Sequence, residues 1–237
     1  HARLPINTET IIVSALILLL AYFIRGISGF GSGLVAVPLL ALYLPLQFVV
    51  PLVLVVDFTA SAVLGHGTRQ HARWDEVRVL LPASAVGIIL GVGLLIHLPR
   101  QPLLTGLGLI VLLFGLRSVL ALHGARRVSR WWAVPAGLTG GMIGALFGTG
   151  GPPYVIYLSH RLRDKSQLHA TFSALFLIDG GLRLVTFIIA GLLLQDGVFM
   201  ALLGALPLMA LGLYAGHRVH IGLSSAQMQR IVGGLLL

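Results

Sequence analysis

Two aspartates, Asp57 and Asp179, lie near the middle of apolar runs, where ionisable side chains are rare. The chain has only seven acidic residues, and the others fall in loops or at the ends of apolar runs. A charge at the centre of a bilayer costs roughly 2.5–3.5 kcal/mol on insertion scales, so such a residue indicates a function by default. We expect at least one of the two aspartates to bind and release a proton. The plainer alternative is that both only hold backbone amides at helix breaks.

Two arginines are placed to balance these carboxylates or to attract an anion. Arg183 follows Asp179 by four residues, so on a helix the two side chains share a face. The same spacing after Asp57 brings Ser61, which leaves Asp57 without a local cation. Arg25 precedes a glycine-rich segment and is therefore the candidate either to pair with Asp57 or to attract a substrate.

Two glycine-rich segments, SGFGSG and FGTGGPP, interrupt apolar sequence. Freed backbone amides in lipid cost several kcal/mol each unless they line a cavity or meet a ligand. Helix ends with exposed N–H groups attract anions, and Ser32 and Thr149 add hydroxyl donors. Pro152 and Pro153 favour a stop in the preceding helix. The alternative is that the glycines only allow close helix packing, which is the interpretation we favour for Gly87 and other isolated glycines. The residues expected to hold an anion are Gly31, Ser32, Gly33, Gly148, Thr149, Gly150, Gly151, Arg25 and Arg183.

Other kinds of site find little support. Neither glycine segment has the lysine of a phosphate-binding loop. No spacing of histidines and carboxylates indicates a metal site, and no nucleophile with a base indicates an enzyme. Cysteine is absent, so thiol chemistry is excluded. We expect no cofactor and no catalytic residue.

The elements that carry these residues are membrane helices. The chain is 57% hydrophobic and 10% charged, a balance that a soluble domain of 237 residues could not cover with polar surface. Several apolar runs reach the roughly 20 residues needed to cross a bilayer. The runs are Thr10–Ile24, Phe48–Gly65, Val77–Ile96, Pro102–Leu122, Trp131–Phe147, Ala170–Leu194 and Gly197–Ala215. We therefore predict an all-α, multi-pass protein of the bacterial inner membrane, in contact with lipid and formed as a single domain over residues 1–237.

The formal charge of +9 does not indicate nucleic acid, because the basic residues lie in short loops between apolar runs. This is the positive-inside pattern, and it places those loops in the cytoplasm. The basic residues of these loops are Arg69, Arg73, Arg126, Arg127, Arg130, Arg161, Arg163, Lys165 and Arg218. The connections at residues 44–47, 97–101 and 195–197 are poor in basic residues and should face outward.

An internal repeat organises the chain. Gly31-Ser32-Gly33 recurs as Gly148-Thr149-Gly150, and Asp57 in LVLVVD matches Asp179 in LFLID. Pro82, Gly87 and Gly91 then match Pro207, Gly212 and Gly216 in the same order. We place the first copy at about residues 8–122 and the second at about 131–237. Because the last span, from about Ser224, looks short, we expect the native chain to continue beyond Leu237.

The loop charges also predict the topology of each copy. Arg130 and Arg161 are placed on the same side, with GTGGPP between them, so this segment must enter the membrane, break and return. The repeat predicts a similar hairpin at residues 11–44, entering from the outside. Each copy is then one re-entrant hairpin and three crossings, an odd number, which makes the two copies inverted. Inverted repeats with broken helices are a transporter architecture.

The sequence resembles the TauE/SafE family of sulfite and organosulfonate exporters over nearly its whole length. The resemblance lies in GFGSGLVAVP, in AGLTGGMIGALFGTGGPPYVIYL and in DKSQLHAT. Ser32 departs from the family's usual glycine in the first segment. The resemblance implies outward transport of sulfite, sulfoacetate or a related sulfur oxyanion, driven by an ion gradient through alternating access. Another small anion, such as a carboxylate, and an anion channel are the alternatives.

Overall fold

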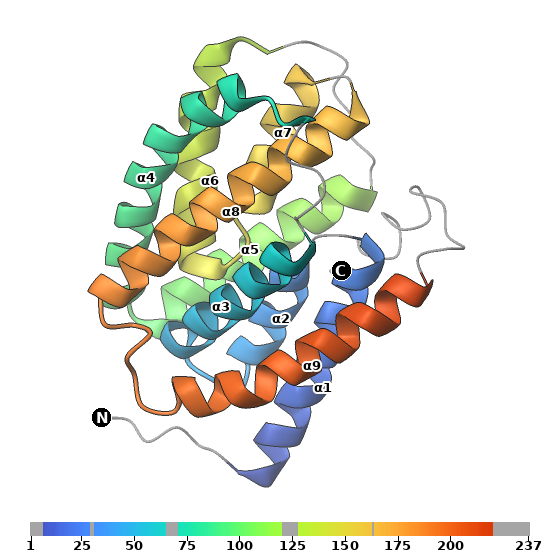
Figure 1. Ribbon diagram of the computed structural model, residues 1–237. Coiled ribbons are helices and arrows are strands. Elements are labelled where there is room, and N and C mark those ends of the chain that lie inside the picture. The colour runs from blue at the N-terminus through green and yellow to red at the C-terminus, as the bar shows by residue number, and fades with distance from the viewer. Residues whose placement is uncertain (1–6, 29–30, 65–70, 120–127, 163, 220–237) are drawn as a thin grey trace. The chain divides into compact units, whose positions relative to one another are not determined.

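The computed structural model describes residues 7–28, 31–64, 71–119, 128–162 and 164–219 of the protein. All regular structure within these ranges is helical, with no strand among them (Figure 1). The elements are α1 (Thr8–Ser28), α2 (Ser32–Ala41), α3 (Leu46–Leu64), α4 (Trp74–His97), α5 (Arg100–Val119), the short 3₁₀ helix η3 (Arg130–Trp132), α6 (Ala133–Phe147), α7 (Gly151–Arg161), α8 (Lys165–Ile189) and α9 (Val198–Val219). The predicted all-α class is confirmed.

Five helices are long and apolar enough to cross a membrane, namely α1, α3, α4, α8 and α9. The predicted multi-pass architecture is therefore confirmed. The apolar part of α5, Arg100–Leu116, is shorter. Several residues used in the sequence analysis lie outside the described ranges. They are Arg69, Arg126, Arg127, Arg163 and the predicted last span from Ser224.

The second hairpin has the expected form. α6 has 15 residues and α7 has 11, so at about 1.5 Å per residue neither can cross about 30 Å of hydrocarbon. α1, by contrast, has 21 residues and is long enough to cross, followed by α2 with 10. The length of α1 does not support equivalence of the two hairpins, and the inverted repeat stays a prediction.

One apolar run is longer than the helix that it contains. The apolar run that we extended to Leu194 is helical only to Ile189. Gly191 follows with a φ of +74°, a left-handed conformation that ends the helix and that glycine adopts without the steric cost of a Cβ. Hydrophobicity alone could not locate this end, because the residues after it remain apolar.

The chain divides into two compact units, and the first contains His1–Val56, Pro99–Leu122 and Leu194–Leu237. Its main contact is α1 against α9, which lie side by side in Figure 1. Glycines make this contact close: a Cβ on Gly26 would come within 2.6 Å of the Leu213 carbonyl oxygen, and one on Gly216 within 2.2 Å of the Phe23 oxygen. α1 also contacts α2, and α2 contacts α5.

The second unit contains Asp57–Leu98 and His123–Leu193. Its main contact is α4 against α6, and glycines again allow it. A Cβ on Gly87 would lie 2.2 Å from the Leu138 oxygen, and one on Gly141 would lie 2.3 Å from the Ser84 oxygen. α8 packs on α4, while α7 contacts both α6 and α8. The packing role expected for Gly87 is confirmed.

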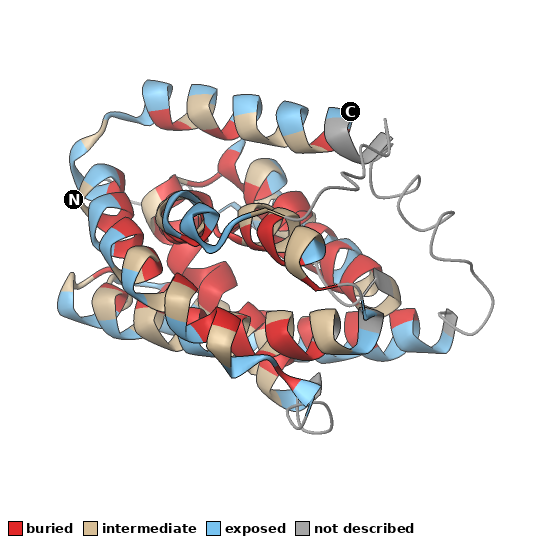
Figure 2. Cartoon of the chain, turned by 90° about the horizontal axis from the view of Figure 1, so that it is seen from above, coloured by how far each residue is buried: buried red, intermediate tan, exposed pale blue. Residues whose placement is uncertain are grey.

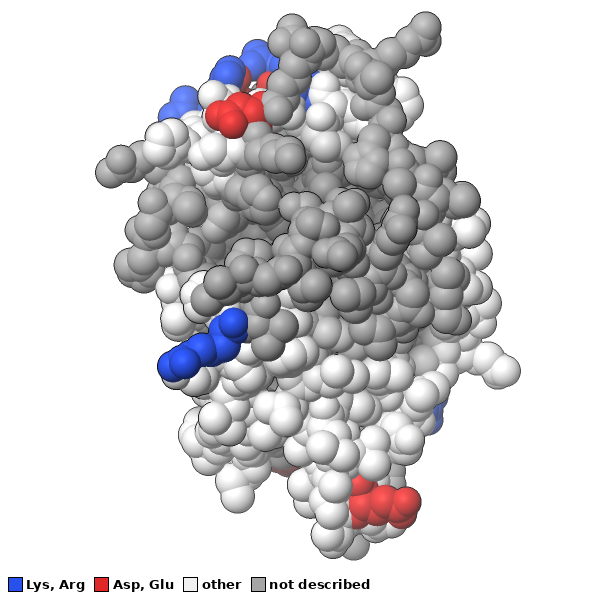
Figure 3. Space-filling model, turned by 90° about the vertical axis from the view of Figure 1, so that its right-hand side faces the viewer, with Lys and Arg blue, Asp and Glu red and all other residues white. Residues whose placement is uncertain are grey.

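The described helices carry an apolar exterior. In Figure 2 the long helices show an exposed stripe and a buried stripe. Large hydrophobic side chains occupy the exposed stripes, for example Ile89, Ile189 and Met200. Most of the described surface in Figure 3 is uncharged; one group of basic and acidic side chains lies at the upper left, and a few charged side chains lie apart from it. Such a surface suits contact with lipid chains rather than water.

Candidate functional site

The second glycine segment forms a tight turn between α6 and α7. Gly148 ends α6 with a φ of +66°, and its N–H donates to the Gly144 oxygen at 2.9 Å. α7 begins at Gly151, with Pro152 and Pro153 in its first turn, where the fixed φ of proline suits a helix start. The break predicted at GTGGPP is therefore confirmed.

The turn is folded closely against α6. A Cβ on Gly150 would come within 2.5 Å of the Gly140 oxygen, and a Cβ on Gly140 would come within 2.4 Å of the Tyr154 ring. Glycine at these two positions lets α7 approach α6 and leaves room for the tyrosine. The glycines of this segment therefore act both in packing and in shaping the turn.

Arg183 brings a buried positive charge to this turn. Its side chain is 1% exposed, and Nη1 donates to the Gly144 oxygen at 3.1 Å. The position of a Cβ on Gly144 is 3.1 Å from Arg183 Nη1 and 3.3 Å from Gly150 Cα, so guanidinium and turn lie side by side. Nε is 2.9 Å from Asp179 Oδ2, without hydrogen-bond alignment. The predicted pairing of Asp179 and Arg183 is thus present.

Several donors at this turn have no acceptor among the described residues. The Nη2 group of Arg183 has none, and neither has the Thr149 hydroxyl, on a side chain that is 3% exposed. Within the described ranges, no acceptor is found for the backbone N–H groups of Gly150 and Gly151 either. The following two prolines have no N–H, which reduces the donors that we expected at this helix start. The remaining donors and the guanidinium suit an oxyanion.

Asp179 is held by two hydroxyl groups that the sequence analysis did not identify. Tyr154 Oη donates to Asp179 Oδ1 at 2.7 Å, and Ser84 Oγ also bonds to Oδ1. The two hydroxyl oxygens are 2.8 Å apart. The available signal was a polar residue inside an apolar run for Ser84, and a tyrosine directly after the prolines for Tyr154. Neither signal says that these residues meet.

The first glycine segment lies in the other unit and is built differently. Gly31 has a φ of +94°, and α2 begins at Ser32, whose side chain is 1% exposed. Arg25 Nη1 donates to Ser32 Oγ at 3.0 Å, so two predicted site residues are in contact. Gly33 is buried beside them.

Asp57 belongs to the second unit, whereas Arg25 belongs to the first. The Asp57 side chain is 4% exposed, and its backbone oxygen accepts from Ser61 Oγ at 2.8 Å. Its expected pairing with Arg25, and the expected meeting of the two glycine turns, stay predictions.

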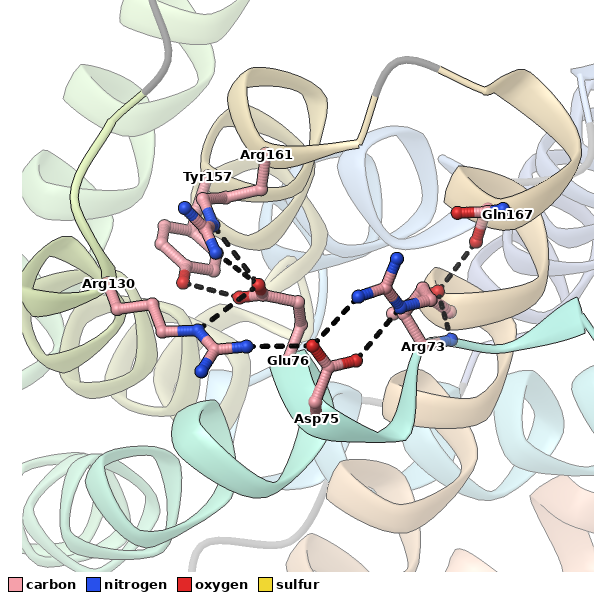
Figure 4. Close-up of polar contacts among 8 residues, drawn as sticks. Arg73, Asp75, Glu76, Arg130, Tyr157, Arg161 and Gln167 are labelled. Atoms are coloured by element: carbon pink, nitrogen blue, oxygen red, sulfur yellow. Dashed lines mark hydrogen bonds and ion pairs between the residues drawn. The ribbon is translucent and has the colours of Figure 1, made fainter.

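The far end of α7 is fixed by a second buried carboxylate, Glu76, which is 2% exposed (Figure 4). Arg161 Nη2 lies 2.6 Å from Glu76 Oε1, and Tyr157 donates to Oε2 at 2.7 Å. Arg130, which precedes α6, lies 3.6 Å from the same carboxylate and 2.7 Å from Asp75. The two outer ends of the α6–α7 hairpin therefore meet at one residue, as the enter-and-return path requires.

The rest of this cluster is more exposed. Arg73 forms two hydrogen bonds to Asp75, each of 3.0 Å, and its backbone N–H donates to Thr171. The hydrogen bonds that Arg73 donates to Asp75 raise the pKa of the Arg73 guanidinium, and those that Arg161 donates to Glu76 raise the pKa of Arg161. Both arginines therefore keep their charge. We had placed them only as loop cations, and sequence alone did not show their partners.

No group of three or more histidine or acidic side chains among the described residues is arranged to hold a metal ion. The polar groups of the second unit thus form two sites on α7, one at each end. The end at Gly151 offers donors to an anion, while the end at Arg161 is filled by internal ion pairs.

Comparison with known proteins agrees with this chemistry. The profile of the family described as "Sulfite exporter TauE/SafE" matches residues 14–237. The chain is 29% identical over 189 residues to the "Probable inner membrane transporter protein TsaS" of Comamonas testosteroni, which covers 78% of each chain. No solved structure matches the chain.

Proposed function

This chain belongs to the sulfite exporter TauE/SafE family of transporters for sulfur-containing anions, and from that premise we propose that it carries a small sulfur oxyanion across the bacterial inner membrane. Sulfite, sulfoacetate and related organosulfonates are the substrates that we propose. The relative named as an inner membrane transporter supports the proposed location. Membership of a transporter family also argues against an enzyme.

The observation that carries the proposal is the buried guanidinium of Arg183 beside the Gly148–Gly151 turn. A buried donor without an acceptor costs about 1–3 kcal/mol, and more when it is charged. An oxyanion at the turn would accept from Nη2 of Arg183, from the Thr149 hydroxyl and from the amides of Gly150 and Gly151. These charge-assisted hydrogen bonds would give the unpaired donors their acceptor and would also hold the substrate.

The first glycine turn contributes to the proposed site through Gly31, Ser32 and Gly33, with Arg25 as its cation. Here the Ser32 oxygen already accepts a bond from Arg25. We therefore propose that the second turn makes the main contacts with the oxyanion.

Transport requires that the site open to each side in turn. We propose alternating access in which α-helical units move as bodies, with export as the physiological direction, in line with the family description. Coupling to a proton gradient would use Asp57, Asp179 or both, because these are buried carboxyl groups within apolar helices.

The test is uptake of radiolabelled sulfite into proteoliposomes, with and without a pH gradient, and with protein-free vesicles as background. We expect saturable uptake that sulfoacetate competes and chloride does not. Arg183→Ala should lower it strongly, whereas Arg78→Ala, which removes an exposed arginine of α4, should not.

Three results would contradict the proposal in different ways. Conductance without saturation or counterflow would indicate an anion channel. Transport of a small carboxylate in place of sulfite would assign another substrate class. Full uptake by Arg183→Ala would remove Arg183 from the site.

A further inference from the structure

Three buried oxygens form a closed triangle beside Arg183. They belong to Ser84 on α4, Tyr154 on α7 and Asp179 on α8, and each side chain is 0% exposed. Tyr154 Oη is 2.7 Å from Asp179 Oδ1 and 2.8 Å from Ser84 Oγ, while Ser84 is also hydrogen-bonded to Oδ1. The lack of a side chain at Gly140 makes room for the tyrosine ring.

The triangle has three oxygen–oxygen contacts, and each needs one proton to be a hydrogen bond. Ser84 and Tyr154 bring one hydroxyl proton each. With Asp179 ionised, two of the contacts are hydrogen bonds, and in the third contact two oxygens face each other with no proton between them. A proton on the carboxyl group fills the third contact. The arrangement is therefore complete only when Asp179 is protonated.

Arg183 links this triangle to the anion site. Its Nε contacts Asp179 Oδ2, and its Nη2 is the donor without an acceptor at the glycine turn. The ionised Asp179–Arg183 pair is neutral as a whole. An anion bound to Arg183 adds one negative charge to a buried site, and burying an uncompensated charge is costly. One proton on Asp179 restores neutrality.

The other helices around Asp179 contribute few ionisable groups that could bind the proton in place of Asp179. α6 contributes the Gly144 carbonyl, which accepts from Arg183, and has no ionisable residue. α3 packs against α8 where Phe58 meets Gly180, and the ionisable group beside that contact is Asp57. Phe176 lies about two helical turns before Arg183 on α8, with its ring centroid 5.5 Å from the guanidinium carbon. α7 contributes Tyr154 to the surroundings of Asp179, and α4 contributes Ser84.

We propose that Ser84, Tyr154 and Asp179 form a proton-binding site, and that this site binds its proton when an anion binds to Arg183. This inference rests on the proposed function and adds how it is coupled. The carboxylate of Asp179 takes one proton and becomes a neutral acid, while Arg183 stays charged and exchanges Asp179 for the substrate. Ser84 and Tyr154 are positioning residues, since they act through Asp179.

The coupling has a consequence for direction. A monovalent anion and one proton load together, so the loaded site carries no net charge beyond that of the empty one. The membrane potential then does not drive this step. Export proceeds where the outward anion gradient exceeds the inward proton gradient.

The test is infrared difference spectroscopy of the purified full-length protein, titrated with pH, in the presence and absence of methanesulfonate. This probe is a monovalent sulfonate with no second acid group. We expect a carbonyl stretch from a protonated carboxyl group that grows when methanesulfonate binds. It should be lost in Asp179→Asn and shifted in Tyr154→Phe and Ser84→Ala, while exposed controls Asp196→Asn and Tyr43→Phe should keep it unchanged.

The outcomes separate this inference from the proposed function. If the wild type binds methanesulfonate but shows no band that depends on Asp179, the proton site is wrong. If no sulfonate or sulfite binds, the proposed function is wrong and the anion coupling is wrong with it, while the pH titration of the anion-free protein still decides whether Asp179 binds a proton in this triangle. A band that Asp179→Asn removes and Tyr154→Phe shifts supports the proton site, and a band indifferent to both overturns it.

Discussion

Thr149 shows at the residue scale how a binding site leaves a group unsatisfied until its ligand arrives. Its hydroxyl is buried and has no partner among the described residues. A buried hydroxyl without a partner does not stabilise the protein, because it has given up its bonds to water. The same hydroxyl becomes useful when an anion accepts from it. Stability and binding should therefore respond in opposite ways to its removal.

This argument makes a prediction for Thr149→Val, which keeps the shape of the side chain. Sulfite binding should weaken by about 0.5–1.5 kcal/mol, the net value of one hydrogen bond, which is roughly two- to tenfold in affinity. The melting temperature of the ligand-free protein should not fall. Equilibrium binding and thermal unfolding in the same detergent measure both. Thr149→Ser should bind as the wild type does, and Thr139→Val, at an exposed threonine of α6, serves as the control. Unchanged affinity in Thr149→Val would exclude this hydroxyl from the site.

Gly148 makes a second prediction at this scale, because its φ of +66° is left-handed. A residue with a Cβ in this conformation costs roughly 1–2 kcal/mol. Gly148→Ala should therefore lower the melting temperature and disturb the turn that presents the donors, reducing transport as well. Gly204→Ala, in the exposed helical part of α9 with open space around it, should be neutral or stabilising. Equal melting temperatures for the two variants would show that the turn is not strained by a side chain.

At the scale of the element, α7 is a short helix that is fixed at both ends by side chains of one face. Tyr154, near its start, reaches Asp179, while Tyr157 and Arg161, near its end, reach Glu76. Those spacings of three and four residues keep the groups on one side of the helix. A helix of 11 residues would be marginal alone, so these contacts and its packing on α6 hold it in place.

Removing Arg161 should therefore be costly. Breaking a buried ion pair by deleting one partner costs about 3–5 kcal/mol, and we expect Arg161→Ala to fall at the lower end because Arg130 also contacts Glu76. Arg73→Ala, which breaks an exposed and solvent-screened pair, should change the melting temperature far less. Thermal unfolding measures both. Adding Glu76→Gln to Arg161→Ala should recover part of the loss, because it removes the stranded charge. No recovery would mean that the pair is not what fixes α7.

Features that depend on residues close together in the sequence could be predicted from the sequence. The break at GTGGPP, the apolar helices and the Asp179–Arg183 pair all follow from neighbours a few residues apart. The contacts of Ser84 with Tyr154, and of Glu76 with Arg161, join positions 70 and 85 residues apart. They depend on how α4, α6, α7 and α8 assemble, and a single sequence does not encode that assembly in any local pattern. The end of α8 at Ile189 could not be located from hydrophobicity, because the apolar run continues to Leu194.

At the scale of the whole molecule, the two units use the same packing device. In each, an early helix and a late helix meet through glycines whose Cβ atoms would collide with the partner backbone: α1 with α9, and α4 with α6. The predicted repeat matches Gly87 and Gly91 of α4 with Gly212 and Gly216 of α9. If the repeat holds, the glycine-packed pair in each unit combines one helix of each copy. Such an arrangement suits carriers in which two similar bodies alternate in exposing one site.

Inverted copies require particular ends of the helices to face particular sides, and this gives the last prediction. The basic loops should be cytoplasmic, because positive residues are retained on that side. The chain contains no cysteine, so a single introduced cysteine reports its own position without background. A membrane-impermeant maleimide added to intact cells should label Gln101→Cys and Asp196→Cys, both at exposed positions outside the basic loops. His71→Cys and His217→Cys, which are exposed beside basic residues, should react only after the membrane is opened. Labelling of His71→Cys and Asp196→Cys from the same side would place α4 and α9 in orientations that inverted copies do not allow, and would leave the family's transport chemistry to be explained by another topology.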